Sequence, residues 1–552
     1  MKRIFQIAAL LLTANSIQAQ NNVPDAVVQV ENDYNPVVIK AEKQSFTPQI
    51  EITSNNTPLD LLFSQEAAPF GQFVSQRNVK EVLPQQTKQF PGYARLGYGN
   101  NNNIDARLGY RLLTGKNSHI NMLAAFNGFK TGLNGLEGDW NSRFYNTVLS
   151  AGYTHYFKKF TIGAGAALGN KVFNYQLFEA LAGTGTDKQN SNSFNLQFNI
   201  KSNLSGALSY EAEAGYTLNS RKYANGQKER ISENRFTAKG CINYELPNED
   251  IYRMGAILAL DGFTYNNALK PDEGLKYDNY TSIRFNPFMN FRFDDWKVKL
   301  GVHFDMLTAN GTFMAFAPDC SIEGMLNKNV SLYATVTGGR TLNGFEAMEQ
   351  ISPYWDYVSG INGQYTATYK IFDVTTGTRL AFAPFSTNLY VGYAYTKDDL
   401  LATDVHAIRI HTLFEQHNTR SLYLGGRFGY DYNGWFNFLA DARYDHISCS
   451  GPEFWLMYKP QITLDLNAEA RLYKGLYANI GYKFVRYTKS DSKLVSGRIE
   501  NMNNLCAKVS YRIDKRLSAY VTANNLLSSD YFAYPGYQVQ GAHFLAGVTF
   551  GF

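Results

Sequence analysis

The chain has 552 residues, 15% of them aromatic, and a formal net charge of +5 that falls to +3 without Lys2 and Arg3. That charge is too small to indicate nucleic-acid binding. The mean hydropathy of -0.31 and the lack of an uninterrupted apolar stretch of membrane-helix length exclude a helical membrane protein. These values do not exclude a membrane β-barrel, because the apolar residues of a barrel alternate with polar ones along each strand.

Residues 1–19 have the features of a secretory signal peptide. Lys2 and Arg3 precede a mostly apolar run, Ile4–Leu12, which is too short to span a bilayer. The small residue Ala19 stands at the expected cleavage site. No cysteine begins the expected mature chain, so we expect an exported protein without a lipid anchor there.

Residues 20–89 differ in composition from the rest of the chain. Six prolines are spread along them: Pro24, Pro36, Pro48, Pro58, Pro69 and Pro84. Prolines at this density oppose long helices and central strands. We therefore predict an extended periplasmic or lumenal segment with little core of its own.

From Phe90 onward, amphipathic strands are separated by alternately short and long connections. The predicted short turns are 114–117, 158–159, 203–205, 247–250, 294–295, 327–329, 384–385, 432–434, 473–475 and 514–516. The predicted longer loops include 128–143, 176–192, 220–231, 266–279 and 337–363. This alternation is typical of transmembrane barrels, which have short periplasmic turns and longer external loops. The predicted fold class is all-β: an antiparallel transmembrane barrel of about 22 strands spanning 90–552, with both termini in the periplasm.

Three segments show the alternation most clearly. From Ile462 to Leu472 every second residue is apolar, and the residues between include Asp465 and Glu469. The segments 436–444 and 476–484 have the same pattern. Each predicts a strand with one lipid-facing side and one water-facing side, and about 9–11 residues are enough to cross a bilayer when tilted.

The last strand predicts how the barrel closes. Every second residue is apolar or aromatic in its final stretch: Phe544, Ala546, Val548, Phe550 and Phe552. An edge strand of a soluble sandwich is the alternative interpretation. On the barrel interpretation this strand pairs with the first strand, near Tyr93–Tyr98, because no later strand is free. Phe544, Val548, Phe550 and Phe552 are therefore the candidate closure residues.

The C-terminal part resembles the last hairpin of TonB-dependent receptors. The resemblance rests on 524–531 (Asn-Asn-Leu-Leu-Ser-Ser-Asp-Tyr), on 534–537 (Tyr-Pro-Gly-Tyr) and on the closing aromatic strand. It implies a 22-stranded barrel from about Phe90 to Phe552 and a terminal strand read by the barrel insertion machinery. That family also folds an N-terminal plug inside its barrel, preceded by a TonB box. Residues 20–89 are shorter than a full plug and lack its usual Gly- and Arg-containing motifs, and Ala26–Val30 is a short match to a TonB box.

No catalytic, cofactor or metal constellation is predicted, and an enzyme is not expected. His406 and His411 are an odd number of residues apart, so on one strand they would face opposite sides. The four cysteines are far apart and form no CxxC pair. Phosphate-binding glycine motifs are also missing.

Aromatic residues in the longest external loop, Tyr354, Trp355 and Tyr357, are candidate ligand contacts. The alternative is an aromatic cluster that folds this loop onto itself, after a short helix predicted at 343–351. The aromatics of the last external loop are interpreted as part of the girdle at the membrane surface: Tyr531, Phe532, Tyr534 and Tyr537.

Two functions fit the sequence. The first is an outer-membrane receptor or channel that takes up a ligand through external loops. The second is a barrel that transports nothing and serves as a scaffold or subunit of an envelope complex, which the short N-terminal segment favours. The expected partners are outer-membrane lipid, the barrel insertion machinery, and TonB or a surface lipoprotein.

Overall fold

The structure is a computed structural model that describes residues 90–552, except 136–137, 177–187, 204–206, 223–229, 247–250, 267–276, 294, 310–312, 356–363, 407–409, 489, 492–495 and 498. The signal peptide and the N-terminal segment fall on residues 1–89, outside the described residues. Those two predictions therefore stay predictions.

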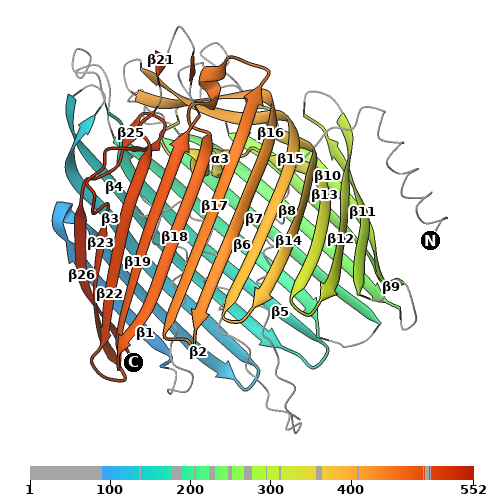
Figure 1. Ribbon diagram of the computed structural model, residues 1–552, viewed down its shortest axis with the longest axis horizontal. Helices are drawn as coiled ribbons and strands as arrows, with labels where there is room; N and C mark the ends of the chain where they lie inside the picture. The colour runs from blue at the N-terminus through green and yellow to red at the C-terminus, as the bar shows by residue number, and fades with distance from the viewer. Residues whose placement is uncertain are drawn as a thin grey trace.

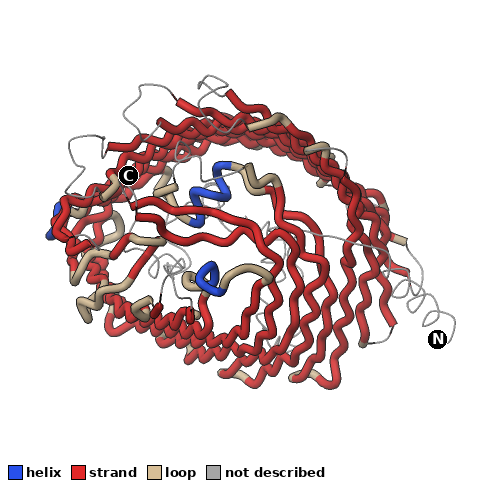
Figure 2. The backbone as a smooth tube through the Cα atoms, turned by 90° about the horizontal axis from the view of Figure 1, so that it is seen from above, coloured by secondary structure: helices blue, strands red, loops and turns tan. Residues whose placement is uncertain are grey.

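A single 22-stranded antiparallel sheet curves round and closes on itself as a barrel (Figures 1 and 2). Its strands are β1 (Gly92–Gly99), β2 (Ile104–Gly115), β3 (Ser118–Gly135), β4 (Gly138–Tyr156), β5 (Phe160–Asn174), β6 (Lys188–Ser202), β7 (Leu208–Lys222), β8 (Arg230–Glu245), β9 (Ile251–Asn266), β10 (Tyr280–Phe293), β11 (Trp296–Leu307), β12 (Phe313–Asn327), β13 (Val330–Leu342), β14 (Ala367–Phe382), β15 (Phe385–His406), β16 (Ile410–Tyr432), β17 (Phe436–Cys449), β18 (Pro460–Tyr473), β19 (Leu476–Tyr487), β22 (Met502–Arg512), β23 (Leu517–Asn524) and β26 (His543–Gly551). The predicted fold class and strand number are confirmed.

Short elements lie between the barrel strands. They are η3 (Asn100–Asn102), α3 (Phe345–Ile351), η5 (Glu453–Leu456), β20 (Ser490–Asp491), β21 (Ser496–Gly497), β24 (Phe532–Tyr534) and β25 (Tyr537–Gln538). None of the helices among the described residues has the length and apolar character needed to cross a bilayer.

The two faces of the sheet follow the predicted alternation. Leu466 of β18 pairs with Ala440 of β17 and Tyr482 of β19, so the apolar sides of these strands lie side by side. Large apolar side chains are exposed on strands all round the barrel, as at Leu96, Leu168, Phe198, Leu258, Phe316, Leu424 and Ile480. A closed barrel that exposes such side chains is a transmembrane barrel of the kind found in bacterial outer membranes.

The other face of the sheet lines the lumen and carries charge. One cross-strand row joins Arg427 to Asp441, Asp441 to Asp465 and Asp465 to Lys483. The Arg427 guanidinium lies 2.9 Å from the Asp441 carboxylate. Arg427 and Lys483, at the two ends of this row, thus offset the adjacent carboxylates of Asp441 and Asp465.

Closure joins the first and last strands. β1 and β26 are antiparallel, with Leu96 opposite Val548 and Ala94 opposite Phe550. Phe552, beyond the end of β26, exchanges backbone hydrogen bonds of 3.0 Å with Gly92. The predicted partner strand of the C-terminus is confirmed, and neither end strand is left with an unpaired edge.

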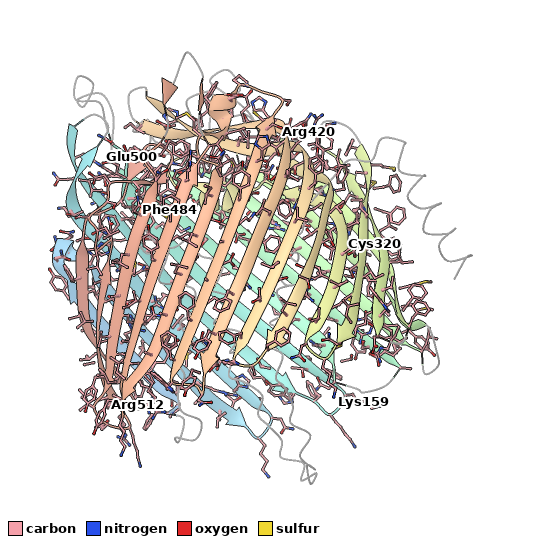
Figure 3. The ribbon with its side chains drawn as sticks, in the orientation of Figure 1. Lys159, Cys320, Arg420, Phe484, Glu500 and Arg512 are labelled. Atoms are coloured by element: carbon pink, nitrogen blue, oxygen red, sulfur yellow. The ribbon has the colours of Figure 1, made fainter. Side chains whose placement is uncertain are left out.

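The two ends of the barrel differ. Short turns such as the one before Phe160 lie at the end that holds the C-terminus, where Lys159 and Arg512 are seen in Figure 3, while Arg420 and Glu500 mark the opposite end.

The prediction of a loop at 128–143 was wrong, because β3 continues to Gly135 and β4 begins at Gly138, with Phe129 opposite Phe144. Likewise β6, β7, β8 and β13 extend into the predicted loops 176–192, 220–231 and 337–363.

Candidate functional site at the mouth of the barrel

The chain itself covers the mouth opposite the C-terminal end. We call this cover the cap. It consists of the outer part of the β15–β16 hairpin (399–406 and 410–417, the lid hairpin), the α3 loop (343–355), η5 and the β24–β25 hairpin. Figure 2 shows two strand segments crossing the interior between the short helices. The cap is therefore built from external connections of several strand pairs.

A bulge bends the lid hairpin over the mouth. Thr396 still pairs with Thr419, but the next pair is Asp399 with His417, so β15 has one more residue than β16 between them. Asp398, within the bulge, has a φ of 53°, in the left-handed region that Asp tolerates better than most residues. Bulges of this kind bend a strand and increase its twist.

Two tyrosines, one in the β24–β25 hairpin and one just after η5, hold the lid hairpin down. The Tyr537 hydroxyl donates to the Ile410 carbonyl at 2.6 Å. The Tyr458 hydroxyl donates to an Asp404 carboxylate oxygen at 2.7 Å and accepts from the Gly536 N–H at 2.9 Å. Both bonds join the lid hairpin to segments that are distant in sequence.

The α3 loop is hydrogen-bonded to the β16 strand of the lid hairpin. The Thr412 N–H donates to the Tyr354 carbonyl at 2.9 Å, and the hydroxyls of Ser352 and Thr412 are 2.6 Å apart. Trp355 forms a parallel β-bridge with Thr412. Because the α3 loop follows β13 and the lid hairpin belongs to β15 and β16, these contacts tie two separately anchored segments together.

Two of the three candidate ligand-contact residues are buried within the cap. Tyr354 stacks on Tyr537 with 3.5 Å between ring centroids and 11° between planes, and Trp355 packs against Phe345. Both Tyr354 and Trp355 have exposed fractions of 0%. Tyr357 lies outside the described residues. Ligand contact by these residues stays a prediction. The buried packing of Tyr354 and Trp355 agrees with the alternative, an aromatic cluster that folds this loop onto itself.

The aromatics of the last external loop are not part of a membrane girdle. Tyr531, Tyr534 and Tyr537 are at most 2% exposed, and they belong to the buried cluster that includes Tyr354 and Phe173. The girdle prediction was wrong because the β24–β25 hairpin folds inward over the mouth. Alternation along a strand carries no information on the direction of a loop.

A row of wall residues faces the cap at its α3 loop. Lys171 of β5 pairs with Ser191 of β6, and Ser191 pairs with Arg221 of β7. All three side chains contact the carboxylate of Glu349 on α3. The Lys171 Nζ lies 3.2 Å from Oε2, and the Arg221 Nη1 lies 3.4 Å from Oε1. The Ser191 hydroxyl also donates to Oε1. No sequence pattern predicts this group, because its members lie far apart in the chain.

Arg221 is held on several sides. Its Nη2 donates to the carbonyls of Pro353 and Trp355 at 2.5 and 2.6 Å and to the Tyr175 hydroxyl at 2.9 Å. Its guanidinium carbon lies 4.5 Å from the centre of the Trp355 ring, in cation–π geometry. A buried arginine with this many partners fixes the α3 loop against the wall.

Ionisation of Glu349 follows from these neighbours. Burial acts to raise the pKa of Glu349, but Lys171 and Arg221 outweigh it and hold the pKa below its ordinary value. Glu349 is therefore charged at neutral pH. Burial also raises the pKa of Tyr354 and of Tyr458 well above the ordinary tyrosine value, so both hydroxyls stay protonated.

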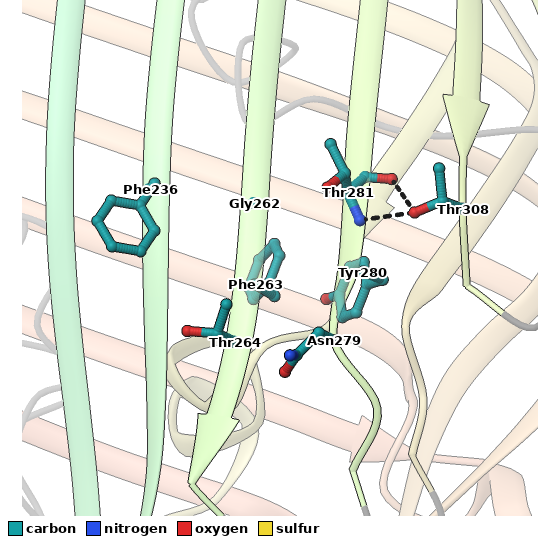
Figure 4. Close-up of a pocket in the computed structure, with 8 residues that line it drawn as sticks. All are labelled: Phe236, Gly262, Phe263, Thr264, Asn279, Tyr280, Thr281 and Thr308. Carbon is teal, nitrogen blue, oxygen red and sulfur yellow. Dashed lines mark hydrogen bonds between the residues drawn. The ribbon is translucent and has the colours of Figure 1, made fainter.

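A small cavity of about 200 Å³ lies beside the ends of β8–β10 that are on the side of the cap (Figure 4). Phe236 pairs with Gly262, and Gly262 pairs with Thr281, in a row on the outward face. Thr281 and Thr308 are joined by hydrogen bonds at the edge of the cavity. This cavity therefore adjoins the outer surface of the barrel and does not belong to the cap.

Within the described part of the chain, no three His, Cys, Asp or Glu side chains are grouped closely enough to hold a metal ion. The register pairs His411 with Val405, which puts His406 and His411 on opposite faces of the lid hairpin. The four cysteines are free thiols.

No protein-family model matches this sequence, and no curated protein matches it. Several solved structures match it in fold. The FrpB iron transporter from Neisseria meningitidis has a TM-score of 0.66 at 12% identity, over 84% of this chain and 82% of that one. A mutant of the ferric enterobactin receptor PfeA from Pseudomonas aeruginosa, in complex with enterobactin, has a TM-score of 0.63 at 11% identity, over 84% of this chain and 82% of that one. The ferric-catecholate import receptor Fiu from E. coli K12 has a TM-score of 0.60 at 10% identity, over 85% of this chain and 82% of that one. The barrel has the fold of TonB-dependent receptors, which confirms the resemblance in fold.

Proposed function

We propose that this protein is a TonB-dependent receptor-like barrel that takes a ligand across the outer membrane. The observation that carries the proposal is a 22-stranded barrel whose mouth is covered by its own external connections. Barrels of this strand number enclose a lumen that their own wall side chains do not fill. A wide lumen with charged walls, covered by a cap that the chain itself forms, is suited to controlled passage of a ligand.

The solved structures with a similar fold also support the uptake of a ligand. FrpB is described as an iron transporter, and Fiu as an import receptor for ferric catecholates. The proposal divides this chain into a signal peptide (1–19), an N-terminal periplasmic or lumenal segment (20–89) and the barrel (90–552). TonB is the proposed source of energy, and a surface lipoprotein is a further candidate partner.

A second candidate function is a scaffold or subunit of an envelope complex that transports nothing. The full burial of Tyr354 and Trp355 favours it, because these aromatics offer no exposed platform to a ligand while the cap is closed. On this proposal the cap is a permanent part of the barrel and need not move.

Planar-bilayer conductance tests passage. One variant replaces 397–418 with an Asn-Gly turn that joins the paired residues Thr396 and Thr419, a short connection suited to a hairpin. A second lacks residues 20–89, and a third combines both changes. Ligand passage predicts a low current for the intact barrel, a larger one for each single change and the largest for the combination. A combined variant that stays as silent as the intact barrel would contradict passage through this lumen.

Growth separates the two candidates in cells. A strain without the protein should fail on one nutrient source in a set of single sources if the barrel imports a ligand. A scaffold instead predicts unchanged growth on every source, together with loss of other envelope proteins from the membrane fraction.

A further inference from the structure

The wall row of Lys171, Ser191 and Arg221 has the chemistry of an oxyanion site. An ammonium, a hydroxyl and a guanidinium converge on the two oxygens of a single carboxylate. The three residues are direct cross-strand neighbours on β5, β6 and β7, so the barrel wall itself sets their spacing. Guanidinium and ammonium groups together recognise carboxylate and phosphate oxygens well.

The carboxylate and the cations belong to parts of the fold that separate if the mouth opens. Glu349 lies on α3 in the cap, whereas Lys171 and Arg221 lie on wall strands. Arg221 is 3% exposed at its side chain and Glu349 is 13% exposed, so the pair is largely desolvated. Removing one partner of such a pair is strongly unfavourable, because the other charge is left without compensation.

An anionic ligand removes that cost. A ligand shifts an equilibrium only by binding one state better than the other. An oxyanion finds the wall row filled in the closed state and vacated in the open state, so it favours opening. A neutral or cationic ligand has no such preference at this row.

We propose that Lys171, Ser191 and Arg221 form an oxyanion-binding site, which Glu349 occupies while the mouth is closed and an anionic group of the ligand occupies when it opens. This proposal rests on the proposed ligand passage and gives the ligand a chemical class: it carries a carboxylate, phosphate or similar oxyanion. Glu349 then acts as an internal stand-in for the ligand and keeps the empty receptor shut.

Calorimetric titration of the detergent-solubilised full-length protein with inorganic phosphate, at constant ionic strength, tests the site. Glu349→Gln removes the competing charge with little change of shape and should bind phosphate at least tenfold more tightly than the unaltered protein. Adding Lys171→Met to Glu349→Gln should abolish the gain. Glu346→Gln, on the exposed side of the same helix, is the matched control and should behave like the unaltered protein.

Heat-modifiable gel mobility confirms that each variant is a folded barrel, and Glu349→Ala replaces Glu349→Gln if the latter does not fold. Phosphate binding by Glu349→Gln no tighter than by Glu346→Gln would overturn the site, and so would equal binding by Glu349→Gln with and without Lys171→Met. The titration needs no passage through the barrel. A conducting barrel without phosphate binding thus refutes the site alone, and a silent barrel that binds phosphate refutes passage alone.

Discussion

Glu349 is the residue on which the wall and the cap are joined most directly. Its carboxylate meets Lys171, Ser191 and Arg221, which lie at least 128 residues away in the chain. No local pattern predicts such a meeting, because each of these polar residues by itself fits the water-facing side of a strand or an exposed helix. Leu466 and Asp465 are the opposite case: adjacent residues on a strand must face opposite sides, so the sequence alone predicts their faces.

The depressed pKa of Glu349 gives the cap a pH dependence with a definite sign. A carboxylate whose pKa is lower in the folded state stabilises the fold at pH values above its ordinary pKa, and this contribution is lost as the pH falls through the folded value. We expect the contribution of Glu349 to cap stability to stay constant between pH 7 and 5 and to be lost at more acidic pH. Fluorescence of Trp355 should shift to the red there. The shift should vanish in Glu349→Gln, and an acid shift that persists unchanged in this variant would refute the assignment to Glu349.

The assigned faces of β18 predict unequal effects of the same substituent. Leu466→Arg puts a cation against lipid, at a cost of about 2–4 kcal/mol near the bilayer midplane. Asp465→Arg lies one residue away on the lumen face, beside Lys483 and Asp441, and should be tolerated far better. Heat-modifiable gel mobility measures the folded fraction of each variant. Equal tolerance of the two substitutions would remove the assignment for this strand.

At the scale of elements, regular strands were predictable and the cap was not. The strands 436–444, 462–472 and 476–484 repeat their pattern every second residue, which is a local property. The bend of the lid hairpin depends on two residues, Lys397 and Asp398, without a glycine or proline to mark it. The inward fold of the β24–β25 hairpin depends on packing against Tyr354, which is distant in sequence. The short helix expected at 343–351 is confirmed as α3, Phe345–Ile351.

Removing the Tyr537 hydroxyl should loosen the lid hairpin without unfolding the barrel. Tyr537→Phe leaves the buried Ile410 carbonyl without this bond, which costs about 1–3 kcal/mol. Hydrogen exchange of backbone amides at 410–417 should therefore become roughly ten times faster or more, since 1.4 kcal/mol corresponds to a factor of ten. Tyr444→Phe, on the outward face of β17, is the control and should change nothing. Unchanged exchange at 410–417 in Tyr537→Phe would show that this bond does not hold the lid hairpin.

At the scale of the whole molecule, closure by β26 is the condition for a stable barrel in lipid. An open edge would leave a row of backbone groups unpaired, each at a cost of several kcal/mol. Removing Gly551 and Phe552, or changing Phe550 and Phe552 to Ser, should leave the protein exported but degraded in the periplasm. A role for the terminal aromatics as an insertion signal is part of the same prediction, and immunoblots of membrane fractions measure it. Normal outer-membrane levels of the truncated protein would contradict it.

A cysteine pair checks the register of closure directly. Leu96 and Val548 are opposite each other on β1 and β26, so Leu96→Cys with Val548→Cys should cross-link in the intact protein. Leu96→Cys with Leu466→Cys joins strands that are not neighbours and should not cross-link. Absence of the first cross-link under oxidising conditions would mean that the barrel does not close in this register.

We propose that the cap has to move before anything passes through the barrel. The hydroxyls of Ser352 and Thr412 are 2.6 Å apart and join the α3 loop to the lid hairpin, two segments rooted in different strand pairs. Single-channel recording of the Ser352→Cys, Thr412→Cys variant lacking residues 20–89 therefore tests whether the cap moves, because a disulfide between the two cysteines would hold the cap closed until it is reduced. We predict no openings in the oxidised state and frequent openings after a reductant is added, whereas the same barrel without the two cysteines opens in both conditions. Equal currents before and after reduction would contradict a moving cap.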